Sequence, residues 1–164
     1  MSDTAIAFIC SNYNKYSVSA LAGALESASK TESLQLYFLS VKKPEVLGDE
    51  ISALLGKHGK VAVCFSFATT NIIQVHKLVT VLRSKLIDPR ITYIAGGPHA
   101  TGDPEGTLAL GFDIVVIGEA EESFPELVSS LSNGPSFSDL RAVKGVAYVE
   151  NGAIIKTGGE DRST

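Results

Sequence analysis

Short apolar runs alternate with segments of helical periodicity along this chain, and this alternation constrains the fold more than any other feature. Strands that are apolar on both faces are typical of a parallel sheet buried between helices. Five rounds of strand and helix, joined by right-handed crossovers, predict an α/β fold. We expect a flavodoxin-like, doubly wound five-stranded parallel sheet in the order 2-1-3-4-5. The predicted strands are residues Ala5–Cys10, Leu34–Leu39, Lys60–Phe67, Thr92–Ala95 and Asp113–Ile117.

Helix start signals occur between these runs. Ser17 is the predicted N-cap of a first helix that reaches Ser29, and Ser123 with Glu126 resembles a capping box before the last one. Asp103, followed by proline, predicts the start of a short fourth helix that ends at Leu110. His58, at the end of the second helix, is expected on the surface, where it is favoured by the helix dipole.

The end of the chain has a different pattern. Residues Gly145–Thr157 form two short apolar segments around Asn151-Gly152, which is a strong signal for a C-terminal β-hairpin. A hairpin alone is only marginally stable in water, so it must pack on the preceding domain or on further chain. We therefore expect residues 1–134 to form a Rossmann-type domain and residues 135–164 to form a linker with this hairpin.

Composition excludes several classes of protein. The net charge of −4 over 164 residues gives no basic footprint for nucleic acid. No apolar run approaches the length of a membrane span, and the start of the chain lacks a secretory leader. Cys10 and Cys64 fall in predicted core strands, which favours buried thiols in a reducing cytoplasm. The three histidines lie on separate elements, so no metal site is predicted.

Glycines follow the fourth and fifth predicted strands directly. Gly96 and Gly97 end one strand, and Gly118 ends the other. A glycine at such a position lets the backbone turn sharply and approach a ligand closely. Ligands of open α/β sheets bind outside the carboxyl ends of the strands, at the switch point, which lies here between the first and third strands. The loops after strands one, three, four and five are therefore expected to form one site.

Three known classes of this fold fit poorly. A receiver domain needs acidic residues where this chain has Cys10-Ser11 and Phe65-Ser66. The loop from Ser11 to Ser17 has hydroxyls but no glycine, which gives a flavin or nucleotide site of flavodoxin type little support, although that alternative stays open. The dinucleotide fingerprint G-x-G-x-x-G is absent after the first strand.

One family resemblance accounts for the glycine-ended loops. The segments Gly96-Gly97-Pro98-His99-Ala100-Thr101 and Gly118-Glu119-Ala120-Glu121-Glu122-Ser123-Phe124, with their spacing and the hairpin that follows, resemble the cobalamin-binding domain found at the amino terminus of many radical SAM proteins. In that family the hairpin leads into the radical SAM domain. The resemblance implies a corrinoid as the partner, held by the loops at the carboxyl ends of the strands.

The resemblance also assigns roles to particular residues. Ser66 with Phe67 and Ala68 corresponds to a serine-containing segment near the nucleotide tail of the corrinoid. Gly96 and Gly97 let that tail pass close to the backbone, and Gly118 with Glu119 closes the wall. The candidate cofactor-binding residues are Ser11, Asn12, Tyr13, Ser66, Phe67, Ala68, Thr69, Gly96, Gly97, Pro98, His99, Gly118 and Glu119.

The chain departs from related cobalamin domains at one position. Mutases and methionine synthases carry D-x-H-x-x-G after the first strand, and Tyr13 stands where their cobalt-ligating histidine would be. A neutral phenol is a poor cobalt ligand compared with imidazole. Two hypotheses follow: cobalamin binds without a protein axial ligand, as in many radical SAM relatives, or the domain has lost cobalamin and keeps its fold as an interaction module.

The chemistry of the parent protein is expected to lie elsewhere. The three-cysteine motif C-x-x-x-C-x-x-C is absent, so neither a [4Fe-4S] cluster nor S-adenosylmethionine cleavage is expected in this chain. No catalytic and no metal-ligating residue is predicted. The resemblance implies that S-adenosylmethionine and the cluster belong to a downstream domain. It also implies a parent enzyme of the radical SAM class that carries out methyl transfer or another difficult C–H reaction.

Overall fold

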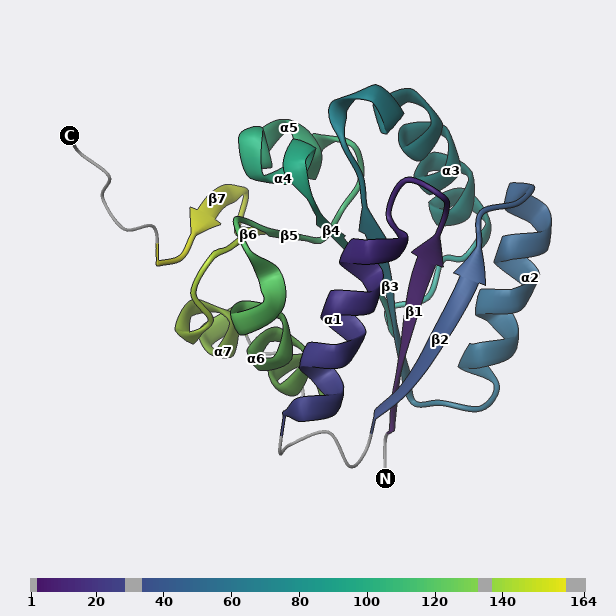
Figure 1. Cartoon of the computed structure of the whole chain (residues 1–164), viewed down its shortest axis with the longest axis horizontal. Coiled ribbons are helices and arrows are strands. Elements are labelled where there is room, and N and C mark those ends of the chain that lie inside the picture. Colours follow the sequence, from purple (N-terminus) through teal and green to yellow (C-terminus); the bar gives the residue numbers. More distant parts are fainter. Residues whose placement is uncertain (1–2, 29–33, 133–136, 159–164) are drawn as a thin grey trace.

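The protein is built around one twisted sheet with helices on both faces (Figure 1). The computed structural model describes residues 3–28, 34–132 and 137–158. In these ranges the sheet has seven strands in the order β2-β1-β3-β4-β5-β6-β7. The strands are β1 (Thr4–Cys10), β2 (Leu34–Ser40), β3 (Lys60–Ser66), β4 (Ile91–Gly96), β5 (Ile114–Val116), β6 (Val146–Glu150) and β7 (Ala153–Lys156).

The first five strands are parallel and confirm the predicted order 2-1-3-4-5. Side chains of β1 alternate between two apolar cores: Ala7 and Ile9 belong to one, and Ile6 and Phe8 to the other. Both sets are buried. This double burial explains why the strands appear as continuous apolar runs in the sequence.

The helices divide between the two faces of the sheet. One face is covered by α2 (Pro44–Leu55), α3 (Ile72–Lys85), α4 (Pro98–Gly102) and α5 (Pro104–Ala109), with a 3-10 turn, η1 (Thr69–Asn71), before α3. The other face is covered by α1 (Lys15–Ser27), α6 (Ala120–Ser132) and α7 (Phe137–Ala142). None of the helices in the described ranges combines the length and the hydropathy needed to cross a bilayer.

The predicted helix starts are right in one case and wrong in two. The Asp103 side chain accepts a hydrogen bond from the Gly106 N–H at 3.0 Å and caps α5, as predicted. Helix α1 instead begins at Lys15 with Asn14 in the N-cap position, so Ser17 lies in its first turn. Ser123 lies inside α6, which begins at Ala120, so the predicted capping box is wrong. The predicted end of the first helix, at Ser29, lies outside the described residues.

His58 is buried, with 6% of its surface exposed, which contradicts its predicted surface position. Its Nδ1 lies 2.9 Å from the Asp3 carboxylate and its Nε2 lies 2.6 Å from the Tyr37 hydroxyl. These partners come from the start of the chain and from β2, and both are distant in sequence. The periodicity of α2 alone could not reveal them.

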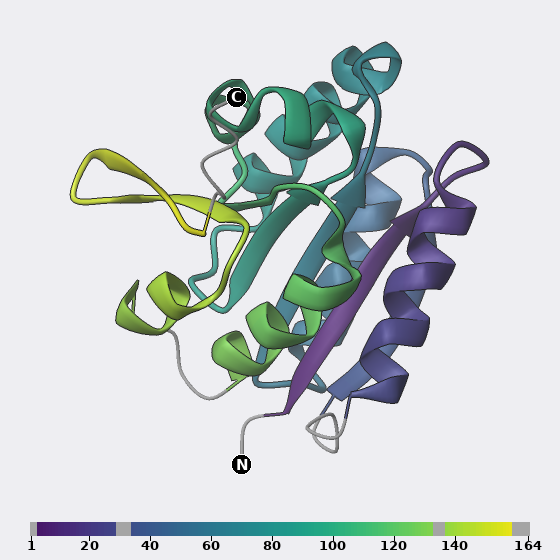
Figure 2. The same ribbon diagram turned by 60° about the vertical axis from the view of Figure 1, so that its left-hand side comes forward.

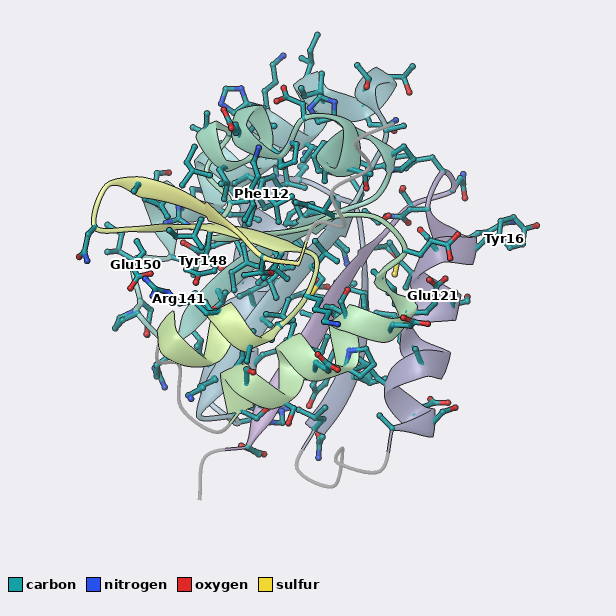
Figure 3. The ribbon with its side chains drawn as sticks, turned by 90° about the vertical axis from the view of Figure 1, so that its left-hand side faces the viewer. Tyr16, Phe112, Glu121, Arg141, Tyr148 and Glu150 are labelled. Carbon is teal, nitrogen blue, oxygen red and sulfur yellow. The ribbon has the colours of Figure 1, made fainter. Side chains whose placement is uncertain are left out.

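The C-terminal hairpin is present and joins the sheet. Its turn is Asn151-Gly152, with positive φ at both residues. Strand β6 pairs antiparallel with β5, with Tyr148 opposite Ile114, so the hairpin extends the sheet (Figure 2). Figure 3 shows Arg141 of α7 beside Glu150 of β6, and the two groups are 2.8 Å apart. The predicted domain boundary at residue 134 lies outside the described residues.

Candidate functional site

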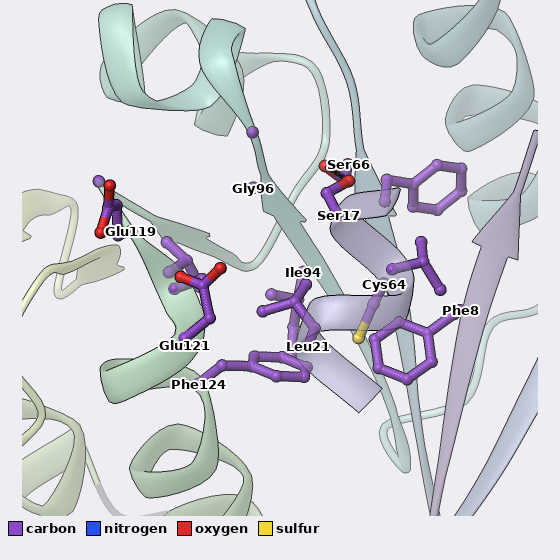
Figure 4. A pocket seen from close by; sticks show the side chains of 16 residues that line it. Phe8, Ser17, Leu21, Cys64, Ser66, Ile94, Gly96, Glu119, Glu121 and Phe124 are labelled. Atoms are coloured by element: carbon purple, nitrogen blue, oxygen red, sulfur yellow. Dashed lines mark hydrogen bonds between the residues drawn. The ribbon is translucent and has the colours of Figure 1, made fainter. Parts of the chain in front are cut away.

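A pocket of about 250 Å³ lies between α1 and α6, at the carboxyl ends of the parallel strands (Figure 4). Its floor comes from the sheet: Phe8 is in register with Cys64, and Cys64 is in register with Ile94. Leu21 of α1 and Phe124 of α6 form its sides. The site therefore lies beside the switch point between β1 and β3, where the strand order predicts a ligand.

The Cys64 thiol is the one heteroatom among the floor side chains of Phe8, Cys64 and Ile94. Its sulfur lies 3.9 Å from the carbonyl oxygen of Ala62, which accepts its weak hydrogen bond. Burial raises the pKa of the Cys64 thiol well above its usual range. A protonated, buried thiol is a poor nucleophile and a poor metal ligand, so Cys64 acts here as an apolar wall.

The mouth of the pocket carries hydroxyl groups on one side. The Ser17 and Ser66 oxygens are 3.1 Å apart, and Ser17 donates to the Asn14 carbonyl at 3.0 Å. The buried Asn14 amide donates to the carbonyls of Ile9 and Ser66, at 2.9 and 3.1 Å. Asn14 thereby fixes α1 to both β1 and β3, and this joint sets the position of the mouth.

The other side of the mouth is acidic. Figure 4 shows Glu119 and Glu121 across the pocket from the two serines. The preceding residue, Gly118, has φ +83° and donates its N–H to the Thr101 hydroxyl at 3.0 Å. This bond ties the start of α6 to α4. The Ile117 N–H donates to the Gly145 carbonyl at 2.7 Å, so the same turn is also held to the beginning of the hairpin.

Gly97 occupies a position that no other residue fits without rearrangement. Its φ is +96°, and an added Cβ would lie 2.8 Å from the Phe67 oxygen and 2.9 Å from the Phe67 nitrogen. Such approaches to backbone atoms cannot be relieved by a side-chain rotation. Gly96 is different: its φ is not positive, and its Cβ would meet the nearest atom, on Val116, at 4.0 Å. Gly97 shapes the backbone, whereas Gly96 leaves space at the mouth.

Some predicted site residues meet at this pocket and others do not. Among its lining residues are Ser66, Gly96, Gly97, Gly118 and Glu119. The remaining candidates lie at the same edge of the sheet but outside the pocket wall: Ser11, Asn12, Tyr13, Phe67, Ala68, Thr69, Pro98 and His99.

The candidates outside the pocket fall into two groups. Phe67 is buried in the opposite core, where it stacks on His99 with ring centroids 5.6 Å apart. His99 Nδ1 lies 3.1 Å from the Thr69 hydroxyl, and its Nε2 is buried without a hydrogen-bond partner in the described structure. Tyr13, in the loop after β1, is 46% exposed. Phe67, His99 and Thr69 form the first group, which packs around the Gly97 turn. The second group is the loop after β1, which contains Tyr13 and is accessible to a ligand at this edge of the sheet.

Sequence reasoning missed the walls supplied by the helices. Ser17, Leu21, Glu121 and Phe124 line the pocket, yet their spacing marked them only as helix core or helix start. A signal did exist. Leu21 and Phe124 belong to the two helices that flank the predicted switch point, and side chains of such helices border the crevice of a doubly wound fold.

The comparison with known families decides the family. The sequence model of the B12 binding domain matches residues 9–128, which run from the end of β1 into α6. The chain belongs to the B12-binding domain family. The match includes the pocket residues of β3, β4 and β5 and the glycine turns that follow them.

Solved structures share the fold of this B12-binding domain. A radical S-adenosylmethionine methyltransferase, TsrM, from Kitasatospora setae matches 96% of this chain with a TM-score of 0.70 and 14% identity. The cobalamin-dependent S-adenosylmethionine radical enzyme OxsB matches 98% with a TM-score of 0.67 and 13% identity. A Methanosarcina barkeri monomethylamine corrinoid protein matches 80% with a TM-score of 0.54 and 16% identity. At these identities the likeness shows the fold alone.

A relative in sequence is also known. An uncharacterized methyltransferase of Pyrococcus horikoshii is 40% identical over 73 residues, which are 43% of this chain. The matched part is 15% of the Pyrococcus protein, and this chain covers 30% of the TsrM chain and 22% of the OxsB chain. The B12-binding domain thus corresponds to a minor part of each of these proteins.

Proposed function

We propose that this B12-binding domain carries a cobalamin at the carboxyl edge of its sheet and presents it to a radical SAM domain of the parent protein. The observation that carries the proposal is the pocket between α1 and α6, which opens at that edge beneath the glycine turns. Bound cobalamin supplies a cobalt centre that can accept and release a methyl group. The domain itself contributes binding and orientation.

The size of the pocket fits part of a corrinoid. At about 250 Å³ it is smaller than sites that enclose a whole drug-sized ligand, which hold roughly 300–1,000 Å³. An aromatic base with its sugar fits this space, whereas the corrin macrocycle is too large and would remain outside. The nucleotide tail is the part of cobalamin that carries such a base. The pocket therefore supports a tail-in arrangement.

The groups at the mouth suit the polar parts of cobalamin. The Ser17 and Ser66 oxygens can accept hydrogen bonds from the sugar hydroxyls of the tail, and the Ser66 proton can turn from Ser17 toward a phosphate oxygen. Glu119 and Glu121 repel a phosphate, but they can accept hydrogen bonds from the amide N–H groups on the periphery of the corrin ring. This difference places the phosphate on the serine side of the mouth in our proposal.

We propose that the cobalt receives no histidine ligand from this chain. Tyr13, where related domains carry the histidine, is exposed in the loop after β1, and a phenol is a poor substitute for imidazole. His99 is stacked on Phe67 and its Nε2 is buried, so it is not free to reach a metal. In the described ranges, no group of three or more His, Cys, Asp or Glu side chains could hold a metal ion.

The assignment to a radical SAM parent rests on the family resemblance and on the extent of the fold likeness. The match to TsrM and OxsB covers 96% and 98% of this chain, a range that includes the hairpin. We propose that residues 1–134 are the cofactor domain and that residues 135–164 lead toward the radical SAM domain. The [4Fe-4S] cluster and S-adenosylmethionine belong to that domain, and methyl transfer is the reaction class we favour. Cys10 and Cys64 are free thiols, consistent with a reducing cytoplasm.

The test is retention of hydroxocobalamin by the purified chain after desalting, read from its visible spectrum. Gly96→Leu is the informative variant, because its side chain lies on the same face of β4 as Ile94 and enters the mouth without backbone strain. Gly23→Leu is the matched control, since Gly23 is exposed on α1 with no atom within 4 Å of its Cβ position.

We expect the wild type and Gly23→Leu to retain corrinoid absorbance and Gly96→Leu to lose it. A clean protein spectrum at saturating cobalamin would overturn the carrier role and leave an interaction module with the family fold. Retention of FMN in a parallel experiment, without retention of cobalamin, would favour the flavodoxin-type alternative.

A further inference from the structure

The floor of the pocket offers no hydrogen-bonding group to whatever enters it. Among the described residues, Phe8, Cys64 and Ile94 line it side by side from β1, β3 and β4. The Cys64 S–H points to the carbonyl of its own strand, at Ala62. Val116 continues the floor on β5. An incoming group therefore meets carbon and one weakly polar sulfur.

The backbone of the floor also offers no free hydrogen-bonding group to a ligand. Strands β1, β3 and β4 are hydrogen-bonded to neighbours on both sides, so their N–H and C=O groups are used in the sheet. The sides add Leu21 and Phe124, which are also apolar. The available hydroxyls, on Ser17 and Ser66, lie at the mouth. Polarity therefore falls from the mouth to the floor.

This gradient discriminates between tail bases. In a corrinoid tail the five-membered ring of the base carries the ribose, so the six-membered ring enters deepest. In dimethylbenzimidazole that ring carries two methyl groups. In adenine it carries an amino group and ring nitrogens. Methyl groups gain from apolar contact, whereas buried donors and acceptors without partners are costly.

We infer that this pocket selects corrinoids by their tail base, accepting an apolar benzimidazole and disfavouring an amino-purine, with Cys64 as a specificity-determining residue. The inference rests on the proposed function, because it assumes that the tail enters the pocket. It adds the chemical class of corrinoid that the domain takes. The row of Phe8, Cys64 and Ile94 provides the selecting surface.

The experiment compares three corrinoids on the purified chain by ultrafiltration: cobalamin, the corrinoid with adenine in place of dimethylbenzimidazole, and cobinamide, which has no nucleotide tail. We expect the adenine form to bind about tenfold more weakly or worse, since one unpaired buried polar group costs about that factor. Cobinamide should also bind more weakly than cobalamin, because it leaves the pocket empty.

Two cysteine variants make the test specific. Cys64→Ser places a hydroxyl on the floor. It should reduce the ratio of the affinity for cobalamin to the affinity for the adenine form by about threefold, as expected when one partial hydrogen bond is restored. Cys10→Ser is the matched control: Cys10 also bonds to the carbonyl two residues earlier, Phe8, but does not line the pocket. It should leave the ratio unchanged.

The outcomes separate this inference from the proposed function. Equal binding of cobalamin and the adenine form would overturn the selectivity while corrinoid binding stands. Equal binding of all three corrinoids would show that the tail does not enter the pocket. This result would also overturn the selectivity while corrinoid binding stands. Failure of all three to bind would overturn the carrier role, and the inference with it. If Cys64→Ser does not fold, the ratio of the wild-type affinities for cobalamin and the adenine form alone tests the selectivity.

Discussion

The hydroxyl oxygens of Ser17 and Ser66 lie 3.1 Å apart and join the first turn of α1 to the carboxyl end of β3. Ser17 donates its proton to the Asn14 carbonyl. Ser66 is therefore the donor in the contact between the two serines, and its lone pairs remain available at the mouth. The relationship explains how the side of the mouth opposite Glu119 and Glu121 presents an ordered acceptor.

Ser66→Ala is expected to weaken corrinoid binding about fivefold, since one hydrogen bond is worth about 1 kcal/mol. Ultrafiltration with hydroxocobalamin measures the change. Ser19→Ala is the control, because the Ser19 hydroxyl bonds to the Lys15 carbonyl at 2.8 Å on the exposed side of the same helix. Equal affinities for Ser66→Ala and Ser19→Ala would contradict a role for Ser66 at the mouth.

Gly97→Ala is expected to lower the free energy of unfolding by about 2 kcal/mol or more, because it combines a positive φ with a collision against backbone atoms. Urea denaturation followed by circular dichroism gives the value. Gly102→Ala, at the end of α4, is the comparison: no atom lies within 4 Å of its Cβ position and its φ is not positive. A Gly97→Ala protein as stable as Gly102→Ala would show that the turn relaxes easily.

Asp3→Asn is expected to reduce stability above about pH 4 but not in stronger acid. The hydrogen bond from His58 lowers the pKa of Asp3 below its usual value, with a further contribution from the Gly59 N–H. Because the pKa of Asp3 is lower in the folded than in the unfolded state, the ionised carboxylate stabilises the fold. This contribution is fully present above the pKa of the unfolded state, about 4, and is lost as the pH falls through the pKa of the folded state. Urea denaturation at pH 5 and at about pH 2–3 should therefore show the gap between wild type and variant closing.

The matched variant for this series is Asp49→Asn, on the exposed side of α2. Its difference from the wild type should change less across the same pH range. A gap for Asp3→Asn that stays constant into acid would mean that the Asp3–His58 contact does not contribute through the charge of the carboxylate.

The parallel sheet could be predicted because its signal is local. Ala5–Cys10 and Lys60–Phe67 are apolar at nearly every position, and only strands buried on both faces require that pattern. The hairpin was equally clear from Asn151-Gly152, which takes positive φ at both residues as its turn type demands. The glycines at the strand ends indicated the correct edge of the sheet for a pocket.

What could not be predicted depends on contacts between distant segments. His58 is buried because Asp3 and Tyr37 meet it, and neither is its neighbour in sequence. Ser17 looked like an N-cap, but Asn14 takes that position because its amide can reach the carbonyls of two strands. Helix α4 was missed, since Gly-Gly-Pro has the composition of a loop. The partner strand of the hairpin was not specified by any local pattern.

The floor lies on strands, whereas the mouth lies where strand ends, turns and helix starts meet, and this placement has a consequence for how such a domain can be modified. Phe8, Cys64 and Ile94 are held at the fixed spacing of adjacent strands, about 4.8 Å. Their substitution changes the depth and chemistry of the floor without moving the turns above it. Insertions after β1 or β3 would alter the rim and leave the floor as it is. An engineer can therefore retune ligand choice and rim geometry as two separate parameters of one scaffold.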